Sequence, residues 1–147
     1  MELEALIDAE TGKRLTYKEL MEEVKKTAGY LESKGFKSGD VIATHVYNSN
    51  EAAVLLLGIQ YIGGVICLVD PLFKANEVLY YIEDSGAKCL FTHLKSDEIE
   101  LTENLNCEII NIKDYEEEIK NFKYEEKDFY NYKEDELAML LYTSGST

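Results

Sequence analysis

The stretch VIATHVYNSNEAAVLLLGIQYIGGVICLV, residues 41–69, decides the fold of this chain. It opens with Val41–Val46, a short run whose branched side chains favour a buried β-strand. Ser49 is a typical helix-start residue, and the segment Glu51–Ile62 that follows is apolar almost all round. Two glycines end that segment before a second apolar run, Val65–Val69. The stretch therefore predicts a strand, a helix and a strand, with a helix that the rest of the protein covers.

The same unit recurs downstream. A helix is expected from about Asn76 to Asp84 with a stop at Gly86, followed by a strand over Lys88–Thr92. A weaker segment then leads to another strand over Cys107–Ile112. Such alternation builds a mostly parallel sheet with helices on both faces, because crossover connections are right-handed. The predicted fold class is a doubly wound, three-layer α/β fold of the Rossmann-like kind.

Upstream of the stretch, the sequence predicts a capped helix. Thr16 is the candidate N-cap, and Glu19 completes a capping box in which each side chain bonds the other residue's backbone N–H. Apolar residues then recur at helical spacing until Gly35 ends the helix. A short apolar run, Glu4–Asp8, and a turn lead up to this helix.

Composition limits the possible functions. A chain of 147 residues with 46% hydrophobic content supports one core, so residues 1–147 are expected to form a single α/β domain. The formal net charge of -14 argues against binding to nucleic acid or to an anionic membrane, both of which would be repelled. No basic leader and no membrane-spanning apolar run are seen, so a cytoplasmic location is expected. The three cysteines lie in predicted strands and are expected to be reduced core residues: Cys67, Cys89 and Cys107.

The stretch Asp114–Glu136 breaks the alternation, because acidic and aromatic residues are mixed there at no regular period. We expect a surface connection with a partial helix, packed by its own rings. The alternative is a segment on which a partner docks, which would make the chain a non-catalytic interaction module. Charge reversal at Glu116, Glu117 and Glu118 would test that alternative.

The candidate functional site follows the last predicted strand, a buried one over Leu137–Tyr142. That strand runs into five small residues: Thr143, Ser144, Gly145, Ser146 and Thr147. Glycine lets the backbone come close to a ligand, and successive N–H groups at the carboxyl end of a parallel strand form a nest for an anion. Such a string more often marks an ordinary turn, but its place after a strand favours a phosphate site. It matches neither Gly-x-x-x-x-Gly-Lys-Ser/Thr nor Gly-x-Gly-x-x-Gly, the loops of other nucleotide-binding folds.

Three motifs together resemble those of the AMP-binding superfamily of adenylate-forming enzymes. Tyr142–Thr147 is similar to the opening of its signature loop, which continues as Gly-x-Pro-Lys-Gly. Leu15–Leu20 is similar to its first core motif, and Gly63–Pro71 to its Gly-Gly-Ala-Tyr-Val-Pro-Ile-Asp-Pro type segment. Glu83–Lys88 follows in the usual place, whereas Leu68 stands where a proline is common. The superfamily includes acyl- and aryl-CoA synthetases, among them 4-coumarate-CoA ligase-like enzymes, luciferases and peptide-synthetase adenylation domains.

The resemblance implies an enzyme that joins a carboxylate to the α-phosphate of ATP, with Mg²⁺, and then passes the acyl group from AMP to the thiol of CoA or of a carrier protein. It places the loop residues on the β- and γ-phosphates, and it assigns no catalytic and no metal-binding residue to this chain. The family's other functional residues would lie beyond Thr147. The chain is therefore expected to be the amino-terminal part of such a ligase, inactive alone and able to self-associate.

The resemblance leaves the substrate and the acceptor open. Leu72-Phe73 and the start at Met1 favour a free-standing acyl- or aryl-CoA synthetase. Ser146 and Asp70-Pro71 favour an amino-acid-activating adenylation domain.

Two histidines end predicted strands near the expected ligand-binding edge. His45 and His93 have no carboxylate or cysteine partner in the sequence, so structural or solvent-facing roles are expected for both. Asp70 is expected to shape a turn.

Overall fold

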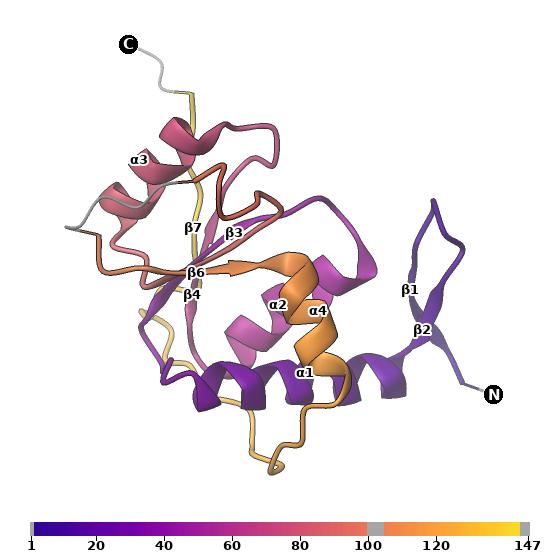
Figure 1. The fold of residues 1–147 in the computed structure, drawn as a ribbon. Coiled ribbons are helices and arrows are strands. Elements are labelled where there is room, and N and C mark those ends of the chain that lie inside the picture. Colours follow the sequence, from indigo (N-terminus) through magenta and orange to yellow (C-terminus); the bar gives the residue numbers. More distant parts are fainter. Residues whose placement is uncertain (1, 100–104, 145–147) are drawn as a thin grey trace.

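The computed structural model describes residues 2–99 and 105–144 (Figure 1). Within these residues, five parallel strands form the main sheet in the order β6-β5-β3-β4-β7. The strands are β3 (Val41–His45), β4 (Val65–Leu68), β5 (Cys89–Thr92), β6 (Glu108–Asn111) and β7 (Met139–Leu140). The parallel sheet and its crossover connections confirm the predicted fold class.

Helices cover both faces of this sheet. They are α1 (Tyr17–Ser33), α2 (Asn50–Tyr61), α3 (Ala75–Ser85) and α4 (Ile112–Lys120). Figure 1 shows α3 on one side of the strands and α1, α2 and α4 on the other. The result is the predicted three-layer arrangement.

Adjacent residues of one strand point into the hydrophobic clusters on opposite faces of the sheet, since side chains alternate along a strand. Ile42 and Ile66 belong to the cluster under α1, α2 and α4, whereas Ala43 and Cys67 belong to the cluster under α3. All four side chains are fully buried. Strands that are buried on both faces show continuous apolar runs, which is why the stretch at residues 41–69 carries no alternating pattern.

The predicted helix boundaries are confirmed by their caps. Glu19 N donates to Thr16 Oγ1 at 3.2 Å and Thr16 N donates to Glu19 Oε2 at 2.9 Å, which completes the capping box of α1. Ser49 caps α2 by accepting from Ala52 N at 3.0 Å. Helix α3 ends at Gly86, whose φ of 70° is left-handed and favours glycine.

The cysteines are buried free thiols, as expected. Burial raises the pKa of Cys107 to about 11 and raises the pKa of Cys67 and of Cys89 as well. All three are therefore neutral core residues at pH 7. Among the residues that the structure describes, no helix is long and apolar enough to cross a bilayer.

A hairpin at the start of the chain was not predicted as a separate sheet. Strands β1 (Glu4–Ile7) and β2 (Arg14–Thr16) pair antiparallel and project from the main body (Figure 1). Their turn is held by Asp8, whose carboxylate accepts from Glu10 N at 2.9 Å and Thr11 N at 3.0 Å. Strands of three and four residues carry too little periodicity for sequence analysis to separate them from a loop.

The prediction of a buried last strand over Leu137–Tyr142 is wrong in length and in burial. The strand is reduced to β7, which pairs with β4 through Met139 and Leu140. Leu137 and Leu141 are 61% and 68% exposed. The physical reason is position, because β7 lies at the edge of the sheet and has a neighbouring strand on one side only.

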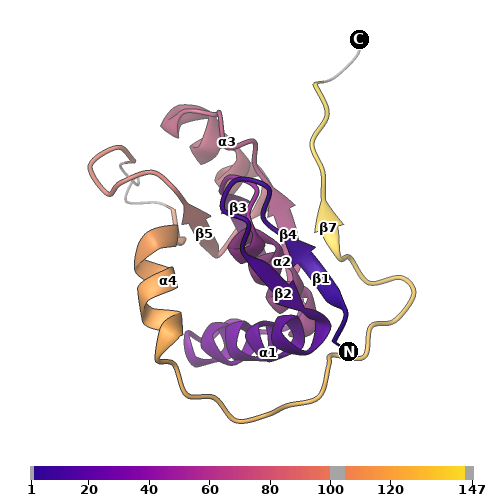
Figure 2. The ribbon, with the colours of Figure 1, turned by 90° about the vertical axis from the view of Figure 1, so that its right-hand side faces the viewer.

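Residues 121–138, the connecting segment, link α4 to β7 by running along α1 (Figure 2) and past the carboxyl end of α2 at Tyr61. Tyr61, at the end of α2, donates its hydroxyl to Lys127 O at 2.6 Å and accepts from Tyr130 N at 2.9 Å. Phe129 packs edge-on against the Tyr61 ring, with the ring centroids 5.3 Å apart. The partial helix of the prediction is confirmed as α4, and the rings of the segment contact α2 as well as one another.

Helices α1 and α2 approach each other closely at Gly58. A Cβ at this position would lie 2.4 Å from Thr27 Cγ2, well inside van der Waals contact. Thr27 is fully buried, and its hydroxyl lies 2.8 Å from the hydroxyl of Tyr115 on α4. Three helices are therefore joined at one buried point.

Gly58→Ala should destabilise the fold at this helix contact. The added methyl overpacks a buried site, at a cost of about 1–3 kcal/mol in the free energy of unfolding, offset by up to about 1 kcal/mol of helix propensity. Urea denaturation would measure the loss. Thr27→Ser in the same chain removes the clashing Cγ2 and should recover part of it, and a Thr27→Ser change that costs as much stability in the Gly58→Ala chain as in wild type would contradict the close contact.

Candidate functional site

The candidate site lies where the parallel strands end. In a doubly wound sheet, ligands bind outside the carboxyl ends of the strands, where chain connections diverge to opposite faces. Here β3 leads into α2 on one face and β4 leads into α3 on the other. The residues that follow β3, β4, β5 and β7 therefore share this edge.

His45 closes β3 at this edge and is fully buried. Its Nε2 lies 3.0 Å from Phe73 O, and a carbonyl oxygen accepts only, so Nε2 carries the proton. Its Nδ1 lies 2.7 Å from Thr92 Oγ1, which already accepts from Leu94 N at 3.0 Å. The neutral ring therefore donates to Phe73 O and accepts from the Thr92 hydroxyl. Burial lowers the pKa of His45, and the neighbouring His93 ring lowers it further.

His93 extends the same arrangement. Its ring stacks on His45 with the centroids 4.6 Å apart, and it meets the Tyr47 ring at the same separation with the ring planes tilted by 36°. Nε2 of His93 lies 2.8 Å from Pro71 O and donates to it. The two imidazoles thus hold the β4–α3 loop by its carbonyls, which confirms the structural role expected for both histidines. Asp70 shapes the start of that loop, as predicted, by accepting from Leu72 N at 2.9 Å.

A cleft of about 470 Å³ opens beside this loop. Its walls are Tyr47, Pro71, Leu72, Phe73, Lys74, Ala75, Asn76, His93, Leu94 and Glu98. The cleft combines aromatic faces with one cation, Lys74, next to the first turn of α3. It lies at the expected ligand edge, whereas a larger groove of about 600 Å³ lies between α1, α2 and α4. In that groove Lys13 pairs with Glu51, at 3.4 Å.

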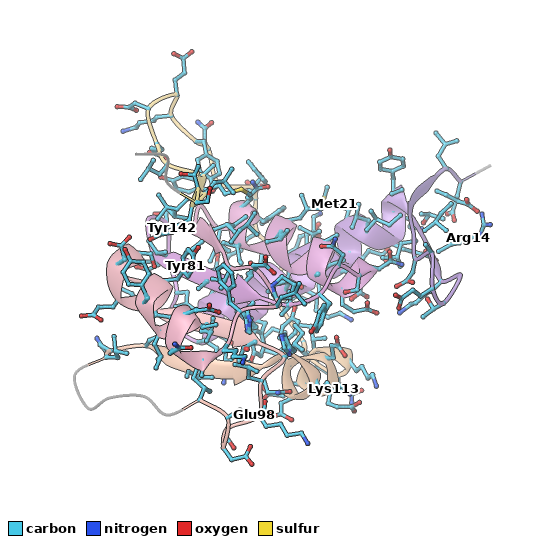
Figure 3. All side chains as sticks on the ribbon, turned by 90° about the horizontal axis from the view of Figure 1, so that it is seen from above. Arg14, Met21, Tyr81, Glu98, Lys113 and Tyr142 are labelled. Atoms are coloured by element: carbon cyan, nitrogen blue, oxygen red, sulfur yellow. The ribbon has the colours of Figure 1, made fainter. Side chains whose placement is uncertain are left out.

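The chain leaves β7 through Tyr142, which contacts α3. Its hydroxyl donates to Asp84 Oδ2 at 2.6 Å, and its ring meets Tyr81 edge-on with the centroids 4.2 Å apart. Figure 3 labels Tyr81 and Tyr142 side by side. The sequence did not predict this contact: the spacing of Tyr81 and Asp84 places both on one face of α3, but it does not indicate Tyr142 as their partner.

Two of the predicted phosphate-loop residues fall within the described chain. Thr143 and Ser144 are exposed and follow Tyr142 directly, so their hydroxyls and backbone N–H groups are accessible to a ligand. Gly145, Ser146 and Thr147 lie outside the described residues. Over residues 2–99 and 105–144, no group of three or more His, Cys, Asp or Glu side chains is placed to hold a metal ion.

A strand followed by a hydroxyl loop at the carboxyl edge of a doubly wound sheet agrees with the comparison to known families. The sequence model described as "AMP-binding enzyme" matches residues 1–147. The chain belongs to the AMP-binding enzyme family.

Similarity to individual members of the AMP-binding family covers small parts of those proteins. Bacitracin synthase 3 of Bacillus licheniformis is 31% identical over 135 residues, which are 91% of this chain and 2% of that protein. The 4-chlorobenzoate–CoA ligase of an Arthrobacter species is 35% identical over 78 residues, which are 53% of this chain and 15% of the ligase. The solved O-succinylbenzoate coenzyme A synthetase of Bacillus subtilis, in complex with AMP, superimposes with a TM-score of 0.82 at 26% identity, covering 99% of this chain and 36% of that one.

Acidification should weaken this AMP-binding fold through His45. The pKa of His45 is lowered in the folded chain, so the unfolded state binds the proton more readily. The stabilisation is complete above the unfolded pKa of about 6.5 and is lost as pH falls from there through the lower folded pKa. His45→Gln retains a donor for Phe73 O but does not titrate, so its melting temperature should depend less on pH between 7.5 and 5.5. An unchanged slope in this variant would show that other groups cause the acid sensitivity.

Proposed function

We propose that this chain forms the amino-terminal α/β subdomain, including the first part of the phosphate-binding loop, of an ATP-dependent carboxylate ligase of the acyl- or aryl-CoA synthetase type. The observation that carries the proposal is that Thr143 and Ser144 follow β7 at the carboxyl edge of the sheet. The whole chain also matches the AMP-binding family. This placement supports a role in holding phosphate groups.

The loop would contribute neutral hydrogen-bond donors. With a formal net charge of -14, the chain has no general attraction for ATP, so binding has to depend on local dipoles. Backbone N–H groups and hydroxyls of Thr143 and Ser144, continued by Gly145, Ser146 and Thr147, would hold the β- and γ-phosphates as charge builds on the leaving pyrophosphate. Mg²⁺, bound to those phosphates, would supply further positive charge.

The reaction would pass through an acyl-adenylate and then transfer the acyl group to a thiol. The partners proposed are a small carboxylic acid, ATP and CoA or a carrier-protein thiol, in the cytoplasm. We propose that these 147 residues do not suffice for turnover, because the loop lysine and the metal- and ribose-binding residues that the family resemblance implies have no counterpart in them. The exposed Leu137 and Leu141 beside edge strand β7 support self-association of the chain on its own.

A second candidate is an amino-acid-activating adenylation domain. It is favoured by Ser146 and by Asp70-Pro71, and it agrees with the match to bacitracin synthase 3 over 91% of this chain. A non-catalytic interaction module has less support. Two rings of the acidic, aromatic stretch are engaged by the body of the protein, since Tyr115 is buried and Tyr132 donates its hydroxyl to Gly64 O at 3.1 Å.

The test is carboxylate-dependent exchange of labelled pyrophosphate into ATP. It should be run on this chain and on a longer product of its gene, if one exists, with fatty, aryl and amino acids in parallel. We expect exchange from the longer protein only, and the acid that supports it would separate the two enzyme candidates. If neither protein exchanged pyrophosphate with any acid, the enzyme proposal would be contradicted. If the 147-residue chain by itself exchanged pyrophosphate, the proposed requirement for further residues would be contradicted.

A further inference from the structure

The hydrogen-bond ladder of β7 ends before the candidate loop begins. Its pairs with β4 are Ile66 with Met139 and Cys67 with Leu140. Leu141 is 68% exposed. Tyr142 is therefore the point at which the described chain is last held before Thr143 and Ser144, both of which are exposed.

Tyr142 is held by two neighbouring groups on α3. The Tyr81 ring fixes the plane of the Tyr142 ring, at 79° and 4.2 Å between centroids, and Asp84 fixes its hydroxyl at 2.6 Å. Tyr81 is itself stacked on Phe73, with the centroids 5.5 Å apart, and the carbonyl of Phe73 bonds His45. The contact of α3 with Tyr142 is thus fixed, through Tyr81, Phe73 and His45, to the central strand β3, and its position does not depend on β7.

The position of Asp84 is unfavourable for α3 itself. A carboxylate in the last turn of a helix faces the negative end of the helix dipole, and α3 has no basic residue in that turn. Among the salt bridges of the described residues, none involves Asp84, so its contact with Tyr142 is the interaction that this structure gives its carboxylate. Helix stability alone would favour another residue here.

We infer that Tyr142 and Asp84 are positioning residues: the hydrogen bond between them sets the direction in which the chain enters Thr143 and Ser144, and so aims their donors at the phosphates. This inference rests on the function proposed above. Both residues would act through the loop and are not assigned a contact with the reacting atoms. A tightly held entry point matters because small displacements of positioned groups cost large factors in rate.

The first experiment measures pyrophosphate exchange by the longer protein with four single variants. Tyr142→Phe and Asp84→Ala each remove the hydrogen bond and should lower kcat/KM for ATP roughly tenfold, the effect of losing about 1.4 kcal/mol. Asp84→Asn keeps an acceptor and should stay within about twofold of wild type. Tyr80→Phe changes the exposed neighbouring tyrosine of α3 and is the matched control.

Two further readouts separate positioning from folding. Asp84→Ala removes a carboxylate from the end of α3 and adds a strong helix former, so its melting temperature should not fall although exchange does. The double variant Tyr142→Phe, Asp84→Ala should be no slower than either single variant, because both remove one shared bond. Exchange within about twofold of wild type in Tyr142→Phe, or losses that multiply in the double variant, would overturn the inference.

A measurement on the 147-residue chain keeps the inference independent of the proposed function. Backbone order parameters of Thr143 and Ser144, measured by NMR relaxation, should fall below about 0.6 in Tyr142→Phe and Asp84→Ala, with Ile66 unchanged. The Asp84→Asn chain should resemble wild type. If the longer protein shows no pyrophosphate exchange but these amides respond, the proposed function fails and the positioning contact stands; amides that do not respond overturn the contact.

Discussion

The burial of β3 on both faces and its pairing on both sides constrain every other element of this fold. Ile42 faces α1, α2 and α4, Ala43 faces α3, and parallel partners flank the strand on either side. A strand in this position has no polar surface to offer water, so both helical layers have to be present for it to be stable. The two hydrogen bonds of His45 at its carboxyl end follow from the same constraint, because a buried imidazole needs a partner for each ring nitrogen.

Much of the architecture could be predicted from local chemistry. The capping box at Thr16, the cap at Ser49 and the left-handed stop at Gly86 each depend on residues within one turn, and all three are found where the sequence placed them. The strands β3 and β4 were predictable for a related reason, since burial on both faces leaves them short, largely apolar runs. The length of β7 was not, because whether Leu137 and Leu141 are covered depends on neighbours far away in sequence.

The location of the candidate site was predictable from the sequence, but the side-chain contacts that build it were not. A strand that runs into Thr143 and Ser144 marks the ligand edge of the sheet on pattern alone. The contact between Tyr142 and Asp84 joins residues 58 positions apart, and no periodicity in a single sequence reports such a pair. The same holds for His45 and His93, whose sequence positions near strand ends indicated the edge without indicating that the two rings stack.

The route of the connecting segment has a consequence for the order of folding. Strand β7 reaches β4 only after the chain has passed α1 and the carboxyl end of α2, where the segment is bonded to Tyr61. The pairing of Ile66 with Met139 closes a long loop, and closing it costs chain entropy. We expect this pairing to form late in folding, after the helices that contact the segment are in place. Strands β3, β4 and β5 are linked by shorter crossovers, so the centre of the sheet can form as a nucleus while the edge strand is still free. Nascent or partly unfolded molecules would therefore differ from the native state first at β7 and at the loop that it carries.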